Sequence, residues 1–288
     1  MARARHRRGS CLSRLLVLAM LVVVLGYPFY AARNLQVESK TLEVSGLNPA
    51  LDGLTIVYVS DIHEGALYSH NRVKSLITKI NELGADLVLL GGDYGNDSQT
   101  AIEFFQHLPK IHARYMVAGV VGNHDRTAPE TNLGLLQSAM LNAGVLPLVN
   151  AVREVRVNDS ALYLCGVDDY NNGHPAISQV AAQVRQDDFT IFLTHSPDNL
   201  PEAFLTENSE GSMFWFDLAL CGHTHGGQVT FFGKPLFHPT SQVSDRYLSG
   251  WVQENRADVL VSNGVGTVFL PVRLFAPPQM HVITLKRK

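Results

Sequence analysis

Five short motifs of metal-ligating residues constrain this chain most, because each stands at the end of an apolar run. The motifs are Asp61-Ile62-His63, Gly91-Gly92-Asp93, Gly122-Asn123-His124-Asp125, Thr194-His195 and Gly222-His223-Thr224-His225-Gly226-Gly227. Runs rich in β-branched and aliphatic residues are typical of strands that are covered on both faces. Since the ends of such strands meet at one edge of an open α/β sheet, we expect the five motifs to converge there.

The chain alternates between strand and helix patterns from residue 54 onward. Strands are expected at 54–59, 86–90, 115–121, 145–149, 152–157, 161–167, 190–193 and 216–221, and helices at 69–83, 101–108 and 133–142. The segments 229–232, 259–261 and 281–285 are expected to complete a second sheet. Alternation of this kind is typical of a single α/β domain, and the length of the chain fits one such core.

The N-terminal region combines a basic cluster with an apolar segment. The basic residues are Arg3, Arg5, Arg7, Arg8 and Arg14. As a helix, the apolar residues 15–32 would reach ~27 Å, close to the ~30 Å thickness of a bilayer core. We therefore divide the chain into a basic segment at 1–14, a transmembrane or signal-anchor helix at 15–32, a linker at 33–49 and a catalytic domain at 50–288.

The basic flank predicts the orientation of this anchor. Lys and Arg are enriched on the cytoplasmic side of membrane helices, so the N-terminus is expected in the cytoplasm and the domain on the periplasmic or extracytoplasmic side of a bacterial inner membrane. A cleaved signal peptide is the alternative, although no clear small-x-small cleavage site follows. A cytoplasmic domain stays open if the apolar segment only dips into the membrane.

Composition excludes some classes of partner. A formal net charge of −3 gives no global basic field, so nucleic acid is not an expected partner. No obligate protein partner is evident. Cys165 and Cys221 lie in apolar runs and are expected as buried core residues rather than a disulfide.

The ligand types in the motifs indicate a pair of metal ions. The candidate ligands are Asp61, His63, Asp93, Asn123, His195, His223 and His225. Two carboxylates, four imidazoles and one amide would leave about two positive charges uncompensated around two dications, which suits an anionic phosphate ester. The mixture of nitrogen and oxygen donors favours Mn, Fe or Zn over Ca.

In this order, the motifs resemble those of the calcineurin-like metallophosphoesterases over about residues 54–229. The resemblance implies a four-layer α/β/β/α sandwich, here with an N-terminal membrane-anchor helix, and two divalent metal ions at the strand ends. It implies that Asp61, His63, Asp93 and His225 bind one ion, and that Asp93, Asn123, His195 and His223 bind the other. It also implies that hydroxide held by the metals attacks phosphorus while His124 stabilises or protonates the leaving oxygen.

A narrower resemblance rests on fewer residues. Gly-His-Thr-His-Gly-Gly-Gln, the apolar N-terminal segment and the tail motifs at 263–266 and 270–273 look like the membrane-associated branch of that family. This branch contains UDP-2,3-diacylglucosamine hydrolases of lipid A biosynthesis and bacterial phosphodiesterases of uncertain substrate. It implies cleavage of a phosphodiester or pyrophosphate bond, in a lipid-linked substrate such as UDP-2,3-diacylglucosamine. That nucleotide is made on the cytoplasmic side, in conflict with the side that the arginines predict.

One position departs from the family pattern. Many members carry a second acidic residue three positions after the Gly-Asp aspartate, paired with the catalytic histidine, and Asn96 stands there in this chain. An amide stabilises a protonated imidazole less than a carboxylate does, so we expect His124 to be a weaker general acid, or Asp97 to substitute. Substrates with good leaving groups are then favoured.

Further residues are candidates for substrate binding, and simpler roles stay open for each. The candidates are Asn96, Arg126, Gly226, Gly227, Gln228 and Arg273. The glycines and Gln228 could instead form the turn into a strand, and the two arginines could lie in solvent or in salt bridges.

Two other functions fit the same motifs. A protein phosphatase is disfavoured by the anchor and by short loops that leave little room for a peptide-docking surface. A non-catalytic scaffold is disfavoured because every expected ligand position is occupied.

Overall fold

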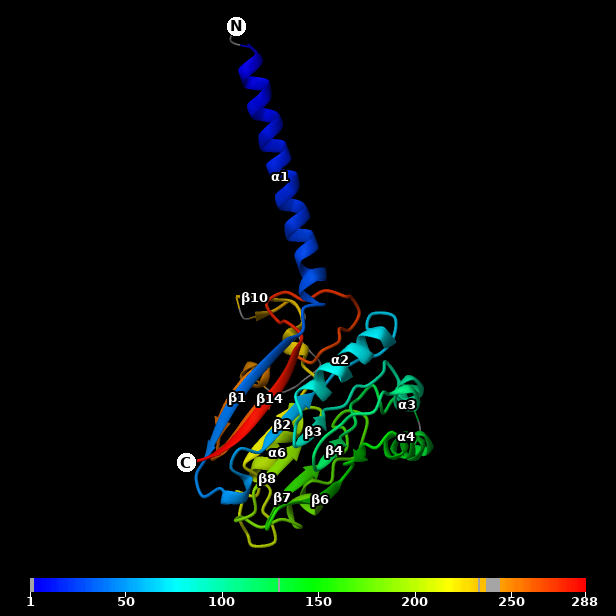
Figure 1. The fold of residues 1–288 in the computed structure, drawn as a ribbon, viewed down its shortest axis with the longest axis vertical. Coiled ribbons are helices and arrows are strands. Elements are labelled where there is room, and N and C mark those ends of the chain that lie inside the picture. Colours follow the sequence, from blue (N-terminus) through cyan, green and yellow to red (C-terminus); the bar gives the residue numbers. More distant parts are fainter. Residues whose placement is uncertain (1–2, 129, 233, 237–243) are drawn as a thin grey trace.

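Two six-stranded sheets lie face to face in the computed structural model, which describes residues 3–128, 130–232, 234–236 and 244–288 (Figure 1). The first sheet has the order β1-β14-β2-β3-β4-β5 and the second β12-β13-β9-β8-β7-β6. Helices cover the outer face of each sheet, and one long helix projects away from the domain (Figure 1). The expected α/β/β/α sandwich is therefore confirmed.

The elements have the following bounds. The strands of the first sheet are β1 (Gln36–Val44), β2 (Thr55–Val59), β3 (Leu87–Leu90), β4 (Met116–Gly119), β5 (Leu146–Pro147) and β14 (Gln279–Arg287). Those of the second are β6 (Ala151–Val157), β7 (Ser160–Gly166), β8 (Thr190–Leu193), β9 (Leu218–Cys221), β12 (Gly250–Glu254) and β13 (Ala257–Val261). A small hairpin consists of β10 (Thr230–Phe231) and β11 (Lys234–Pro235). The helices are α1 (Arg3–Ala31), α2 (His70–Glu82), α3 (Ser98–His107), α4 (Glu130–Asn142), α5 (Ile177–Ala181) and α6 (Leu200–Leu205).

The interior contains three apolar cores, and the side chains of strands such as β2 and β9 alternate between two of them. In β2, Ile56 and Tyr58 face the core between the sheets, whereas Val57 and Val59 face α2, α3 and α4. In β9, Leu220 faces the core between the sheets and Cys221 faces the core beneath α5 and α6. Both faces of these strands are buried, which explains why their sequences are continuously apolar.

The local sequence explains where α3 begins. We expected this helix from residue 101, but it starts at Ser98, because the Asp97 carboxylate accepts from the backbone N–H of Thr100 at 2.8 Å. This contact completes a capping box at the N-terminus. The other helices and strands expected between 54 and 221 are found with bounds that differ by a few residues.

Three expectations about strands are wrong. Residues 33–49, expected as a linker, contain β1, which pairs in parallel with β14. The segment 281–285 lies in β14 and joins the first sheet, between β1 and β2, rather than the second. The segment 229–232 contributes to the separate hairpin, so only 259–261 joins the second sheet, within β13. The pairings of β14 with β1 and β2 join segments far apart in the sequence, so no local pattern predicts them.

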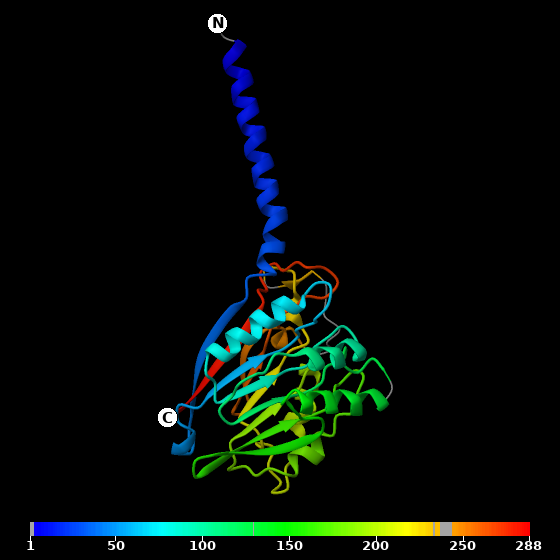
Figure 2. The same cartoon turned by 45° about the vertical axis from the view of Figure 1, so that its right-hand side comes forward.

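Helix α1 extends the expected anchor toward the N-terminus. It runs from Arg3 rather than from residue 15, and the first two residues of the expected basic segment lie outside the described part of the chain. Ser13–Ala31 has a mean hydropathy of 1.9 and no buried residue, so by length and composition it could cross a membrane. The C-terminal end of α1, which we call its foot, meets the domain (Figure 2). There the N–H of Arg273 donates to the Pro28 carbonyl at 3.0 Å.

Candidate metal centre

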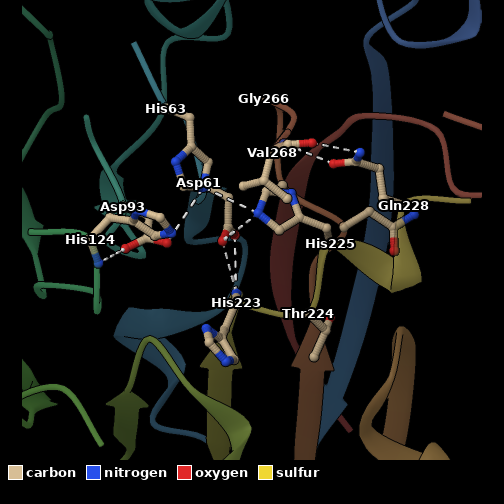
Figure 3. Close-up of polar contacts among 12 residues, drawn as sticks. Asp61, His63, Asp93, His124, His223, Thr224, His225, Gln228, Gly266 and Val268 are labelled. Carbon is tan, nitrogen blue, oxygen red and sulfur yellow. Dashed lines mark hydrogen bonds and ion pairs between the residues drawn. The ribbon is translucent and has the colours of Figure 1, made fainter. Parts of the chain in front are cut away.

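The loops that carry the five motifs leave their strands at one edge of the sandwich. Asp61 and His63 follow β2, Asp93 follows β3, and the Asn123 motif follows β4. From the second sheet, His195 follows β8 and the pair His223 and His225 follows β9. Figure 3 shows the side chains of Asp61, His63 and His225 turned toward one another, with Asp93 beside His63. The structure thus brings together all seven residues that the sequence singled out as ligands.

One set of donor atoms surrounds His63. Its Nε2 atom lies 3.1 Å from Nε2 of His225 and 3.4 Å from Oδ2 of Asp93. Nε2 of His225 lies 3.6 Å from Oδ1 of Asp61 (Figure 3). All four side chains are buried. Asp61, His63 and His225 offer ligand atoms close enough to share one ion.

A second set of donor atoms surrounds Asn123. Its Oδ1 atom lies 2.9 Å from Nδ1 of His223 and 3.2 Å from Nε2 of His195. Nε2 of His195 lies 3.3 Å from Oδ2 of Asp93. The same carboxylate oxygen that contacts His63 in the first set therefore contacts His195 in the second.

Burial leaves three of the four candidate ligand imidazoles neutral. Burial lowers the pKa of His63 and of His223 to about 4, and lowers that of His225 well below its ordinary value. These imidazoles are neutral at physiological pH, which is the form that binds a metal. Burial by itself raises the pKa of Asp93, but His195 above all outweighs it and lowers the pKa, so Asp93 is anionic. Asp93 in turn raises the pKa of His195 well above its ordinary value, so these two side chains form an ion pair. Two neutral ring nitrogens facing each other at 3.1 Å beside a carboxylate are donors suited to a shared cation.

The backbone at the centre is strained. Asp61, His63, Asp93, His223 and His225 all have positive φ, between 50° and 69°. For residues other than glycine this left-handed conformation costs roughly 1–2 kcal/mol each, and such residues are concentrated at functional sites. The loops after β2, β3 and β9 therefore hold these candidate ligands at an energetic cost.

Glycine is required where these loops pack on one another. A Cβ at Gly122 would overlap the carboxylate of Asp93 and would lie 2.8 Å from Cε1 of His195. Residue 122 must therefore lack a side chain if the loops after β3, β4 and β8 are to meet.

Asp125 is a residue of the centre to which sequence reasoning gave no role. Its carboxylate accepts from the backbone N–H groups of Asp93 at 2.8 Å, Tyr94 at 3.0 Å and Gly122 at 2.8 Å. It thereby fixes the loop after β3 against the loop after β4, while burial raises its pKa to about 7. The signal in the sequence was its place two residues after Asn123, in the loop of a candidate ligand. A carboxylate buried in such a loop needs N–H donors and so binds the backbone around it.

His124 lies at the edge of the first set. Its ring meets that of His63 edge-on, with centroids 4.9 Å apart, and its backbone N–H donates to Oδ1 of Asp93 at 2.9 Å. Its Nδ1 lies 3.0 Å from the backbone carbonyl of Asn96. The expected contact with the Asn96 side chain is replaced by this carbonyl. Asp97 is occupied as the cap of α3 and gives the alternative no support.

The other candidates for substrate binding have roles inside the protein. Arg126 is buried and pairs with Asp168 at 3.1 Å, so the salt-bridge alternative holds. The Gln228 amide donates to the carbonyls at 268 and 270 and accepts from the N–H of Val268 (Figure 3). Gly226 and Gly227 are buried, with positive φ, in a short 3-10 turn.

Arg273 is fully buried among backbone carbonyls. Its guanidinium donates to those of Gly266 at 2.6 Å, Asn263 at 2.7 Å, Ala276 at 2.9 Å and His225 at 3.2 Å. Burial lowers its pKa to about 9, which leaves it charged at neutral pH. Arg273 thus supports the loop of the candidate ligand His225, so its candidate role in substrate binding is wrong, and so is the alternative that placed it in solvent.

Comparison with known proteins agrees with this geometry. Residues 54–227 match the family model of the calcineurin-like phosphoesterases. The chain belongs to this family. This phosphoesterase is a metal-dependent phosphoric ester hydrolase with an Asp and His cluster capable of holding metal.

Relatives match across most of the phosphoesterase. It is 29% identical to the uncharacterized metallophosphoesterase YkuE of Bacillus subtilis over 91% of this chain and 89% of that one. It is 28% identical to the phosphodiesterase YaeI of Escherichia coli over 80% and 81% of the two chains. A Danio rerio transmembrane protein with a metallophosphoesterase domain is 26% identical over 97% of this chain and 64% of its own.

A solved structure is also similar. NAD nucleotidase of Haemophilus influenzae is 14% identical, with a TM-score of 0.47, over 74% of this chain. The match spans half of the nucleotidase's length.

Proposed function

We propose that this phosphoesterase hydrolyses a phosphodiester or pyrophosphate bond with two divalent ions, of Mn, Fe or Zn. One observation carries the proposal of two ions. A single oxygen, Oδ2 of Asp93, lies 3.4 Å from Nε2 of His63 and 3.3 Å from Nε2 of His195, so it belongs to both donor sets. A carboxylate shared in this way is the usual bridge between paired metals.

The donor sets assign the ligands. Asp61, His63 and His225 would hold one ion, and Asn123, His195 and His223 would hold the other, with Asp93 between them. Bound ions would supply Lewis acidity at the phosphoryl oxygens and lower the pKa of water. The ligand set carries fewer negative charges than two dications, which favours an anionic substrate.

His124 would handle the proton of the leaving group. The Asn96 carbonyl at 3.0 Å accepts from Nδ1–H and so selects the tautomer. Nε2 is then the ring atom left to face a substrate, beside His63. His124 would stabilise or protonate the leaving oxygen from this atom.

We further propose that the substrate is lipid-linked and that α1 anchors the enzyme in a bacterial inner membrane. The unburied apolar helix Ser13–Ala31 supports this placement, and the N-terminal arginines favour an extracytoplasmic catalytic domain. UDP-2,3-diacylglucosamine is one substrate of this class, but because it is made on the cytoplasmic side it fits only a cytoplasmic catalytic domain. Neither nucleic acid nor an obligate protein partner forms part of the proposal.

A substrate panel tests the proposed reaction. Full-length enzyme loaded with Mn²⁺ should hydrolyse bis-p-nitrophenyl phosphate, and a His124→Ala variant should retain metal but lose most turnover. Preference for a phosphoprotein over UDP-2,3-diacylglucosamine and other lipid-linked esters would favour the protein phosphatase instead. Bound metal without turnover of any ester would favour the scaffold.

A reporter fused to the C-terminus tests the side of the membrane. Activity of a periplasmic reporter is expected, because the arginine cluster precedes α1. Activity of a cytoplasmic reporter would reverse the proposed topology and would make UDP-2,3-diacylglucosamine the first substrate to assay.

A further inference from the structure

Large apolar side chains project into solvent from two loops beside the foot of α1. We call this set the apolar loop surface, and its members are Phe231, Phe232, Leu236, Phe269, Leu270 and Phe275. Phe269 is 96% exposed and Phe232 is 90% exposed. Figures 1 and 2 both place β10 and the orange loop before β14 next to the lower end of α1. A soluble protein rarely exposes so many large apolar side chains together.

The two loops form one braced unit. The Gln228 amide donates to the carbonyls of Val268 and Leu270, and the N–H of Thr230 donates to the carbonyl of Leu274 at 2.9 Å. The N–H of Leu274 donates in turn to the Gln228 carbonyl at 3.0 Å. These hydrogen bonds therefore fix the backbone that carries the exposed phenylalanines.

The backbone at three of these phenylalanines is strained. Phe232, Phe269 and Phe275 have positive φ, between 50° and 58°. Bulky side chains seldom adopt this conformation. Strained backbone that presents an apolar side chain to water points to a missing apolar partner.

The continuity with α1 identifies that partner. The N–H of Arg273, in the loop that carries Phe269 and Phe275, donates to the carbonyl of Pro28 at 3.0 Å. Tyr27 and Tyr30 at the same end of α1 are exposed, as aromatic residues at a membrane interface are. If α1 crosses a bilayer, its foot lies at the interface and the apolar loop surface lies beside it.

We propose that the apolar loop surface inserts into the lipid bilayer around the foot of α1. This second contact would seat the catalytic domain on the membrane instead of leaving it on a flexible tether. Exposed Arg33 and Lys234 lie in the same region and suit anionic headgroups. The metal centre would then open close to the bilayer, because β10 begins five residues after His225. The proposal rests on the membrane placement of α1 and not on the reaction.

Tryptophan quenching tests the insertion in the full-length protein. Phe232→Trp, Phe269→Trp and the control Leu205→Trp would each be reconstituted in vesicles that contain phosphatidylcholine and phosphatidylglycerol, with or without bromine near the top of the acyl chains. Leu205 is 75% exposed on α6, away from α1, and the emission of the native Trp215 and Trp251 is subtracted with the parent protein. Flotation confirms that each variant is bound to vesicles.

The outcomes separate insertion of the apolar loop surface from anchoring of the chain by α1. Loss of most of the added emission for Phe232→Trp and Phe269→Trp, but not for Leu205→Trp, supports insertion. Unquenched emission at all three positions in floating vesicles would overturn it and would point to a protein partner for the same surface. Failure to float would show that α1 does not anchor the chain, and the inference would fall with that placement while the proposed hydrolysis stood.

Discussion

Nδ1 of His124 lies 3.0 Å from the backbone carbonyl of Asn96, and not against its side-chain amide. The identity of the side chain at position 96 is therefore separable from the contact that orients the His124 imidazole, the proposed general acid. Asn96 in place of the family's acidic residue therefore leaves the orientation of the His124 ring unchanged.

Substitution of Asn96 should reveal this separation. We expect Asn96→Ala to keep kcat within about threefold, because the carbonyl remains. Asn96→Asp would add a carboxylate near His124 and favour its protonated form, so the alkaline limb of the pH–rate profile should move to higher pH. A large loss of kcat in Asn96→Ala would show that the amide itself matters, and an unmoved alkaline limb in Asn96→Asp would show that residue 96 does not tune the acid.

Removal of the shared carboxylate should disrupt both donor sets. Asp93→Asn retains the size of the side chain but removes its charge, so we expect metal content to fall and kcat to drop by about 10²–10³-fold. Asp97→Asn is the matched control in the same loop, since asparagine also caps a helix. Metal analysis and turnover of bis-p-nitrophenyl phosphate measure both effects. Full metal content in Asp93→Asn would contradict the bridging role.

Arg273 should matter for stability and, through it, for metal affinity. Lysine cannot reach all the carbonyls that the guanidinium binds, so Arg273→Lys should lower the free energy of unfolding by about 3 kcal/mol. Because Arg273 also supports the His225 carbonyl, weaker metal binding is expected. The control Arg246→Lys, on the surface, should change stability by less than about 0.5 kcal/mol. Denaturant unfolding and metal titration check both, and wild-type stability in Arg273→Lys would refute this account.

Asp217 should make stability depend on pH far from the metal centre. Burial raises its pKa from 3.8 to about 6, although its carboxylate accepts from the Thr190 N–H at 2.9 Å. The folded state therefore retains a proton that the unfolded chain releases, and this stabilisation is lost as pH rises through about 6. Asp217→Asn should raise Tm at pH 8 relative to the wild type, and the gain should shrink near pH 4. Thermal unfolding at both values, with Asp159→Asn on an exposed turn as control, would refute the idea if the gain were the same at each pH.

The sequence was sufficient to predict that the candidate ligands converge, because they follow strands whose patterns are local. Leu87–Leu90 and Leu218–Cys221 are continuous apolar runs, and each ends at a ligand motif, so convergence followed from the geometry of sheets. The left-handed backbone of Asp61 and His63 gave no such signal, because nothing in residue type alone requires it.

Long-range pairing and burial limited the rest. β1 is a half-exposed edge strand whose partner β14 lies at the far end of the chain, so 36–44 was mistaken for a linker. The burial of Arg273 among carbonyls was not foreseen, because arginine is seldom fully buried. The carbonyls that hold it come from segments brought together only by the fold.

The metal content of the full-length enzyme tests the central claim most directly. Protein extracted in mild detergent, dialysed against trace Mn²⁺ or Zn²⁺ and analysed by mass spectrometry of its metals should contain two equivalents per chain. Chelation should abolish hydrolysis of bis-p-nitrophenyl phosphate, and readdition of metal should restore it. One equivalent or none in active, folded protein would contradict a pair of ions shared by Asp93.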